Sequence, residues 1–279
     1  MVGDITWKIN GYDLDTALGA FLTDVSVWRP NVAARRSPIT IPGAHGTINP
    51  GLPVFDEPQV TIVPKWYAAS QAQLEEFTNH ARALFGQPAI VLSRVSGGVE
   101  TSAVANLVSI TEGDFIVGNM ASCTVLLAIP GVFFRGAEVT SDDAAFDSDL
   151  VDVELDADLS GSSAPIGDAV FRITGPASSV SLTDPLTGTG LSWAGSLTAG
   201  QYLYLSGKPL DARISTSSSA WASGGTSELA NLDWPAAGRL QLWPVVQTAS
   251  VRKVLVSAAG GGRTIGVTKL AVRAKASYL

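Results

Sequence analysis

Four acidic residues at alternating positions are the strongest candidates for chemistry in this sequence. They are Asp152, Glu154, Asp156 and Asp158, called the acidic ladder below. Residues two apart on a strand share a face at a spacing of about 7 Å, and glycosidases use paired carboxylates at comparable separations. Calcium also binds clustered oxygens, but its ligands wrap round one point whereas a strand spreads them in a line. The pattern therefore favours a solvated or ion-paired face over a metal or catalytic site.

A basic segment near the end of the chain could supply the counter-charge. After Asp233 the sequence has no acidic residue, and Arg273 and Lys275 alternate with apolar residues as on a half-buried strand. The first and last strands of a sandwich often lie close together. We therefore predict that the acidic ladder faces Arg273 and Lys275, across one sheet or between neighbouring subunits. The alternative is a ladder that is merely solvated, because screening makes exposed ion pairs weak.

Other signals of catalysis are scarce. The two histidines, His45 and His80, have no Cys or His beside them at metal-ligand spacing. Cys123 alternates with apolar neighbours and is expected to be a buried structural residue, and a lone cysteine forms no intrachain disulfide. The sequence has no Gly-x-Ser-x-Gly elbow and no phosphate loop. We predict a protein that is not an enzyme and has no catalytic residues, metal or cofactor.

Composition excludes several other classes. The chain has 279 residues, of which 46% are hydrophobic and 15% charged, so it can bury sizeable cores and is not a disordered chain. A net charge of −7 argues against a nucleic-acid binding site. The first residues lack the basic and apolar regions of a signal peptide. The longest apolar run, 125–134, is about half a membrane span and contains Pro130, so we expect no membrane insertion.

One segment has the pattern of an amphipathic helix. Ser70 begins a capping-box pattern with Gln73 three residues on, and Gly86 with Pro88 supplies a stop. Apolar residues recur at helical spacing between them, namely Leu74, Phe77, Ala81, Leu84 and Phe85. We expect this helix to lie across a sheet, with Leu74, Phe77 and Phe85 as its anchors.

The rest of the sequence predicts a mainly β protein of two domains, because short β-prone segments alternate with Gly and Pro. Residues 1–136 are assigned to a first β domain that carries the helix at about 70–85, and the acid-rich residues 137–150 to a linker. Residues 151–279 are assigned to a β-sandwich of the jelly-roll kind. The Ser- and Gly-rich stretch 215–227 is predicted to be a flexible, exposed loop, which makes Trp221 a candidate exposed aromatic contact.

The order of several short motifs resembles that of the distal tail proteins of long-tailed, siphovirus-type bacteriophages. In the first domain these motifs are Trp7-Lys8-Ile9-Asn10-Gly11, Arg35-Arg36, Ile41-Pro42-Gly43-Ala44-His45-Gly46-Thr47-Ile48, Val60-Thr61-Ile62-Val63, the helix and the strand before Pro130. In the second they are Phe171-Arg172-Ile173-Thr174-Gly175-Pro176, Thr187-Gly188-Thr189-Gly190-Leu191, Leu197-Thr198-Ala199-Gly200-Gln201-Tyr202-Leu203 and the basic terminal strand. The resemblance covers nearly the whole chain.

The resemblance implies a ring-forming β-barrel or split-barrel domain with one helix, followed by a galectin-like or carbohydrate-module-like sandwich. It implies a structural virion protein, synthesised in the host cytoplasm, that forms a ring, usually a hexamer, at the tail tip or baseplate. The implied partners are other copies of the chain, the tail tube protein, the tail-tip hub protein and the C-terminus of the tape measure protein.

Three alternatives stay open. The first is a carbohydrate-binding module or adhesin that contacts a host-surface glycan through aromatic side chains, for which the candidates are Trp193, Tyr202, Tyr204, Trp221, Trp234 and Trp243. The second is a paralogous minor tail protein such as the hub, against which the short length argues. The third, a glycosidase that uses the acidic ladder, has least support.

Overall fold

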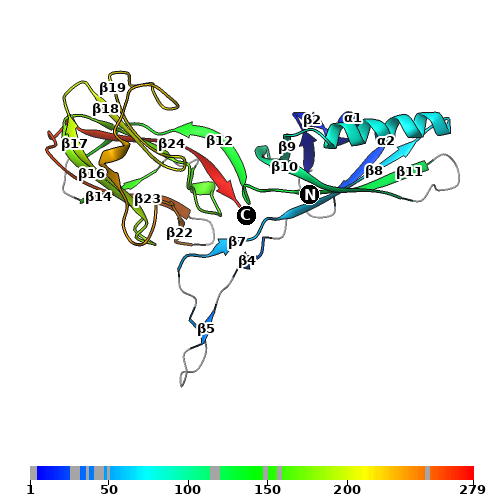
Figure 1. Ribbon diagram of the computed structural model, residues 1–279, viewed down its shortest axis with the longest axis horizontal. Helices are drawn as coiled ribbons and strands as arrows, with labels where there is room; N and C mark the ends of the chain where they lie inside the picture. The colour runs from blue at the N-terminus through cyan, green and yellow to red at the C-terminus, as the bar shows by residue number, and fades with distance from the viewer. Residues whose placement is uncertain are drawn as a thin grey trace. The chain divides into compact units, whose positions relative to one another are not determined.

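The computed structural model describes residues 5–25, 32–35, 38–40, 47–48, 51–113, 120–146, 150–155, 159–248 and 252–279. The protein is mainly β. Its contacts divide it into two compact units, Met1–Gly136 together with Leu279, and Ala137–Tyr278. Each unit is described by itself below (Figure 1). No helix in the described ranges has the length and hydropathy needed to cross a membrane.

The first unit is built on antiparallel strands in the order β2-β1-β9-β10-β11-β8-β3. Their bounds are β1 (Thr6–Ile9), β2 (Tyr12–Asp13), β3 (Leu22–Val25), β8 (Gln59–Tyr67), β9 (Ile90–Ser96), β10 (Val99–Glu112) and β11 (Met120–Ala128). Strand β10 pairs with β9 through residues 99–105 and with β11 through residues 106–112. A register shift between Leu107 and Ser109 lies within the second stretch. Two short pairs complete the described strands, β4 (Ala34–Arg35) with β7 (Val54–Phe55) and β5 (Ile39–Thr40) with β6 (Thr47–Ile48).

Helix α2 (Gln71–Phe85) forms where the sequence places it. The Ser70 hydroxyl accepts a hydrogen bond of 3.3 Å from Gln73 N, and the Gln73 side chain accepts one of 3.0 Å from Ala69 N. The first bond satisfies an amide of the first helical turn, and the second fixes the residue just before the N-cap Ser70. The helix contacts β8, β10 and β11 and lies along the sheet that these strands form (Figure 1).

The packing of α2 differs from the expectation at one anchor. Leu74 and Phe85 are buried, as predicted, whereas Phe77 is only half-buried and stacks on Trp66 at a centroid distance of 6.5 Å. Trp66 in turn donates a hydrogen bond of 2.9 Å from Nε1 to the carbonyl oxygen of Leu18. Leu18 ends α1 (Leu14–Leu18), a helix that the sequence analysis missed because five residues are too few to show a helical period.

The second unit is a sandwich of two antiparallel sheets. One contains β24 (Lys269–Tyr278), β15 (Val170–Thr174), β18 (Tyr202–Gly207), β19 (Leu210–Ser215) and β20 (Thr226–Ser227) in that order, with β12 (Phe134–Thr140) and β13 (Ala144–Ala145) beside β24. The other has the order β14 (Leu150–Glu154), β23 (Arg252–Gly261), β16 (Ala177–Thr183), β17 (Gly190–Leu197), β21 (Leu232–Asp233), with β22 (Pro244–Val246) on β23. Two 3-10 turns, η1 (Leu159–Gly161) and η2 (Leu229–Asn231), are also described.

Alternating residues of the two sheets meet in one core. On β15, Phe171 and Ile173 are buried there, while Arg172 between them lies on the outer face. The facing sheet contributes buried residues such as Leu182 and Val256. Each large apolar side chain that is fully buried contributes about 1.5–3 kcal/mol as an upper bound.

The segment 137–150 is not a plain linker. Its described residues include the end of β12 and the whole of β13, which pairs with β24 through Ala144 and Leu270. Phe146 is fully buried in the sandwich core. The acids of this segment suggested a solvated connection, whereas its strand pairing and the buried ring of Phe146 attach it to the sandwich.

Candidate functional site

The acidic ladder lies only partly within the described residues. Glu154 is on β14 and its carboxylate is 2.7 Å from the ammonium of Lys253, on the neighbouring strand β23. Asp152 pairs through its backbone with Ser257. Asp156 and Asp158 fall outside the described residues. The cation beside Glu154 is therefore Lys253 and not one of the two predicted residues.

Arg273 and Lys275 are on β24, which belongs to the other sheet of the sandwich. The guanidinium of Arg273 forms an ion pair with Glu138 of β12. Within this chain, Arg273 and Glu154 thus have different partners, because β14 pairs with β23 and β24 pairs with β15. A pairing of the acidic ladder with Arg273 or Lys275 of a neighbouring subunit stays a prediction.

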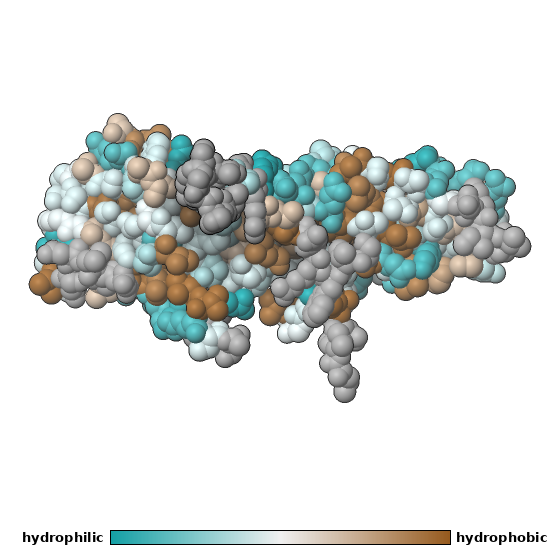
Figure 2. Space-filling model, turned by 90° about the horizontal axis from the view of Figure 1, so that it is seen from below, coloured by the Kyte–Doolittle hydropathy of each residue, from teal (hydrophilic) through white to brown (hydrophobic). Residues whose placement is uncertain are grey.

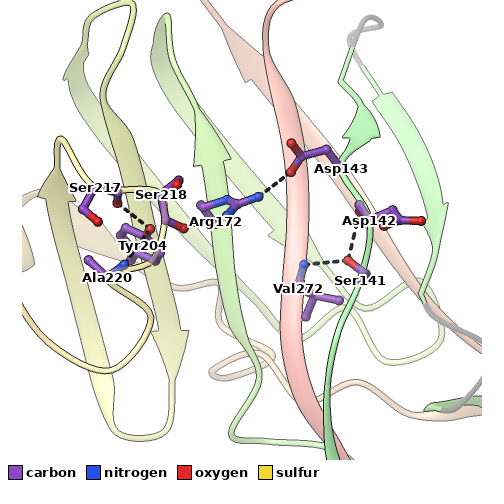
Figure 3. A network of polar contacts seen from close by, with 9 residues as sticks. All are labelled: Ser141, Asp142, Asp143, Arg172, Tyr204, Ser217, Ser218, Ala220 and Val272. Carbon is purple, nitrogen blue, oxygen red and sulfur yellow. Dashed lines mark hydrogen bonds and ion pairs between the residues drawn. The ribbon is translucent and has the colours of Figure 1, made fainter.

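The segment 216–225, called the strap below, is held against the outer face of the sheet that contains β15 and β18. Tyr204 Oη donates a hydrogen bond of 2.8 Å to the carbonyl oxygen of Ser217 and accepts one of 3.2 Å from Ala220 N (Figure 3). Burial raises the pKa of the Tyr204 hydroxyl, so it stays a donor. Although most of its residues are exposed, the strap is thus tied to β18 by hydrogen bonds.

Arg172 reaches the strap from β15. Its Nη1 donates a hydrogen bond of 2.7 Å to the carbonyl oxygen of Ser218, and its Nη2 is 2.6 Å from the carboxylate of Asp143 (Figure 3). The guanidinium carbon also lies 4.9 Å from the centroid of the Trp221 ring. One side chain therefore joins the segment before β13, strand β15 and the strap.

Trp221 is buried, which corrects its assignment as an exposed aromatic contact. It is 8% exposed and makes an edge contact with the Tyr204 ring at 5.6 Å. Arg213 of β19 holds the same turn, because its Nη2 donates a hydrogen bond of 3.1 Å to the carbonyl oxygen of Trp221. Sequence reasoning named Tyr204 only as a candidate for stacking on sugar, and it gave no site role to Arg172 or Arg213. Alternation with the buried Phe171 and Ile173 was the signal that Arg172 faces outward from the sandwich.

A cleft opens beside the strap on the same sheet face. Its volume is about 220 Å³, and it is lined by Glu138, Asp168, Val170, Trp221, Ala222, Arg273, Ala274 and Lys275. Strand register places Val170 of β15 directly opposite Arg273 of β24. The cleft therefore brings together two carboxylates, two cationic groups and the edge of the strap.

The remaining aromatic candidates do not form one platform. Trp193 is 1% exposed in the sandwich core, and Tyr204 is buried under the strap. Trp234 is 40% exposed and lies under the guanidinium of Arg239, whose carbon is 4.7 Å from its ring centroid. An open aromatic surface for stacking on sugar is therefore not present among these side chains.

The histidines and the cysteine have structural surroundings where they are described. His80 is exposed, and its Nε2 is 2.9 Å from the carbonyl oxygen of Ala17, while His45 falls outside the described residues. Cys123 is buried as predicted. Its burial, and to a smaller extent the nearby Glu112 carboxylate, raises the pKa of its thiol to about 11. Within the described ranges, His, Cys, Asp and Glu form no group of three or more that could hold a metal ion.

The first unit exposes apolar side chains on its strands. Val91 of β9 and Val104 of β10 are directly opposite each other on these paired strands, and they are 41% and 55% exposed. We call them the valine pair. Phe21, Leu22 and Tyr67 are also exposed, beside the edge strand β3. On the face drawn in Figure 2, hydrophobic patches interrupt the hydrophilic surface.

Comparison with solved structures gives a full-length likeness. No protein-family model matches the sequence, and no curated protein matches it either. The crystal structure of the phage SPP1 Dit protein, described as a paradigm of the hub adsorption apparatus in phages that infect Gram-positive bacteria, is similar with a TM-score of 0.63 and 14% identity. The likeness covers 99% of this chain and 100% of that one.

Two further structures match over the full length but more weakly. They are the phage p2 baseplate in its activated conformation with strontium, at a TM-score of 0.39 and 10% identity, and with calcium, at 0.36 and 10%. The first match covers 99% of this chain and 100% of the other, and the second covers 98% of each. TM-scores this low do not show a shared fold, and no conclusion is drawn from these two matches. The likeness to the SPP1 Dit protein shows that this chain shares its fold over nearly the full length.

Proposed function

We propose that the chain is a non-catalytic structural protein of a bacteriophage tail tip, where copies of it form a ring at the distal end of the tail tube and join the tube to the hub. The observation that carries this proposal is the full-length likeness to SPP1 Dit, which includes both units and not one common β domain alone. Many unrelated proteins share a β-sandwich, but the order of a helix-bearing β unit and a sandwich is a more specific pattern.

The surface of the first unit supports self-association. An edge strand offers unpaired backbone groups to another chain. On the edge strand β3, Leu22 is exposed beside the charged Asp24, and Phe21 just before the strand is exposed as well. The valine pair adds apolar surface on β9 and β10. Exposed apolar groups on strands are typical of surfaces that another chain covers.

The chemistry of the described residues supports a role without catalysis. The buried thiol of Cys123 is a poor nucleophile because its raised pKa keeps it protonated. Several charged side chains of the second unit pair with one another, as Arg172 does with Asp143 and Arg213 with Asp211. These contacts fasten loops to the sandwich, which is a structural task.

The test is the mass and location of the assembly. Native mass measurement of the purified full chain should give a closed ring, with six copies as the expected number, and labelling of this chain in intact particles should mark the tail tip. A chain that is monomeric within particles, or a label on the head, would reject the proposal. The neighbouring partners, namely the tube protein, the hub protein and the C-terminus of the tape measure protein, should crosslink to it in particles.

A further inference from the structure

We propose that Asn10 is a site of spontaneous deamidation, and that the hydrogen bonds of its carboxamide set the rate of this reaction in the folded protein. Asn10 and Gly11 form the turn between β1 and β2 in the first unit. They are the one Asn-Gly pair in the sequence. The inference goes beyond the proposed structural role and does not depend on it, because it concerns the covalent chemistry of one turn within a single chain.

The conformation of this turn explains why its residues are Asn and Gly. Ile9 and Tyr12 are opposite each other on β1 and β2, so the two residues between them reverse the chain. Both have a positive φ, 51° at Asn10 and 88° at Gly11, as the type I′ turn of a hairpin requires. Asn tolerates this region better than most residues, and Gly adopts it without strain. The hairpin therefore places an asparagine directly before a glycine.

An asparagine before a glycine can react within its own chain. The backbone nitrogen of Gly11 attacks Cγ of Asn10, a Gly11 N–Cγ bond forms, and the Cγ–Nδ2 bond breaks. The proton of the Gly11 amide passes through solvent to the leaving nitrogen, which departs as ammonia. Water then opens the cyclic imide at either carbonyl group and gives aspartate or isoaspartate. Gly11 is exposed and has no side chain to hinder the attack, so the turn meets both requirements.

Hydrogen bonds attach Asn10 to β9 and to Gln87. Its backbone nitrogen donates a bond of 2.8 Å to the carbonyl oxygen of Val91, and its Oδ1 accepts one of 2.9 Å from Val91 N. Its Nδ2 donates a bond of 3.2 Å to Gln87 Oε1. These contacts extend the pairing of β1 with β9 by one residue beyond Ile9 and Leu92. The side-chain oxygen of Asn10 thus takes the place of a main-chain carbonyl oxygen in this ladder.

The bonds of the carboxamide oppose the reaction. Attack makes Cγ tetrahedral and moves Oδ1 and Nδ2 out of their common plane, so it strains the bonds to Val91 N and Gln87. The reaction therefore proceeds from a turn that has left β9, and its rate depends on how often this local opening occurs. In an unfolded chain the carboxamide has no such partners and reacts without this restraint.

Conversion to isoaspartate would change the turn itself. Isoaspartate routes the main chain through the former side chain, so the backbone gains one methylene carbon within a two-residue turn. The pairs Ile9–Tyr12 and Lys8–Asp13 are held at the register of that turn, and the longer link disturbs it. The former Oδ1 becomes a main-chain carbonyl oxygen, which moves the acceptor of the Val91 amide. The modification thus releases the β1–β2 hairpin from β9.

The first experiment compares the full chain in mildly alkaline buffer with the same chain in guanidinium chloride. Digestion and mass spectrometry follow the loss of the Asn10 carboxamide with time. We expect Asn10 to deamidate in guanidinium chloride and to react about tenfold or more slowly in the folded chain. Asn79 is the internal control, because it is exposed and the side chain of the following His80 hinders attack, so it should stay intact over the same time. No reaction of Asn10 in guanidinium chloride, or equal rates in the two conditions, overturns the proposal.

A variant tests the hydrogen bonds of the carboxamide. Gln87→Ala removes the acceptor of Asn10 Nδ2 and should speed deamidation of the folded chain about two- to tenfold, the range expected for one exposed hydrogen bond, with no change in guanidinium chloride. Gln71→Ala is the matched control, because Gln71 is also exposed but bonds Glu75 instead. Circular dichroism should show both variants folded. An unchanged folded-state rate in Gln87→Ala overturns the proposed control of the rate, and the wild-type comparison tests protection by itself.

Hydrogen exchange tests the structural consequence. In chains that carry isoaspartate at position 10, the Val91 amide should exchange faster than in unmodified chains, because its acceptor has moved. Peptides from β11, which pairs with β8 and β10, should exchange equally in both forms. Equal protection of the Val91 amide in both forms would show that isoaspartate leaves the hairpin attached, contrary to the proposal.

Discussion

The guanidinium of Arg172 lies over the ring of Trp221, with its central carbon 4.9 Å from the ring centroid. The same group bonds the carboxylate of Asp143 and the carbonyl oxygen of Ser218. These contacts connect residues far apart in the sequence, and they convert a Ser- and Gly-rich segment into an ordered part of the sandwich surface. Arg172 therefore holds the strap together with Tyr204 of β18 and Arg213 of β19.

Replacement of Arg172 by Lys should release the strap. Lysine keeps the positive charge but lacks the planar fork that serves Asp143 and Ser218 together and stacks on Trp221. We expect a loss of about 1–3 kcal/mol in the free energy of unfolding of the second unit. Urea denaturation measures this loss, and protease cleavage within 216–225 should become faster. Arg252→Lys, at an exposed position of β23, is the control and should change stability by less than about 0.5 kcal/mol.

Local periodicity in the sequence predicted helices and strands, but the partners of the site residues depend on which strands pair, and local periodicity does not show this. The helix could be predicted because Leu74, Ala81 and Phe85 recur on one face within a single segment. The partner of Glu154 could not be predicted, because the residue pattern of β14 does not indicate that this strand pairs with β23. Arg273 and Lys275, the partners predicted from the sequence, are on a strand with an equally suitable pattern in the other sheet of this chain, so their pairing with the acidic ladder of a neighbouring subunit stays a prediction.

The strap shows a second limit of sequence reasoning. Its composition predicts an exposed, flexible loop, and most of its residues are exposed, but side chains of other strands bond it and bury Trp221. Arg172 between Phe171 and Ile173, and Tyr204 between Leu203 and Leu205, have the alternation of solvent-facing residues. Alternation indicates which face a side chain takes, but it cannot indicate that another segment covers that face. For this reason Trp221 was expected to be exposed.

Asp184 should be a sensitive point of the sandwich. It is fully buried, and its carboxylate accepts hydrogen bonds from Thr187 N at 2.9 Å, Thr187 Oγ1 at 2.6 Å and Trp243 N at 3.2 Å. Asp184→Ala leaves these donors without an acceptor and should cost about 3 kcal/mol of stability. Thermal or urea unfolding measures the change. Asp142→Ala, at an exposed position, should be close to wild type, and an equally small effect at both positions would contradict the role assigned to Asp184.

The anchors of α2 should differ in their contributions. Phe85 is fully buried, so Phe85→Ala should cost about 3–5 kcal/mol. Phe77 is half-buried, so Phe77→Ala should cost less, about 1–2 kcal/mol, mainly through the lost stacking on Trp66. Urea unfolding of the full chain, followed through the first unit, compares the two. Equal losses would mean that the helix face is packed differently.

The thiol of Cys123 should make stability fall at high pH. Its pKa is raised from 9.0 to about 11 in the folded protein, first by burial and then by the Glu112 carboxylate. Above pH 9 the unfolded chain therefore releases a proton that the folded chain keeps, so unfolding becomes more favourable as the pH rises from 9 to 11. Cys123→Ser or Cys123→Ala should lose this dependence in urea titrations. In the folded wild type, iodoacetamide should label the thiol much more slowly than in urea.

The valine pair gives the sharpest test of self-association. Val91 and Val104 are opposite one another on β9 and β10, so a charge placed at either position lies at the centre of a small apolar patch. If another copy of the chain covers this patch, Val104→Asp buries an unpaired carboxylate in the interface and should weaken assembly by several kcal/mol per contact, about the cost of an uncompensated buried charge. Native mass measurement should then show smaller species at concentrations at which the wild type forms rings.

Leu186→Asp is the matched control, because Leu186 is 60% exposed in the second unit and the change is chemically the same. Circular dichroism should show both variants folded, since each residue lies at the surface. Rings of full mass in Val104→Asp and in Val91→Asp would show that the valine pair is outside the interface and would leave the edge strand β3, with Phe21 and Leu22, as the surface to change next.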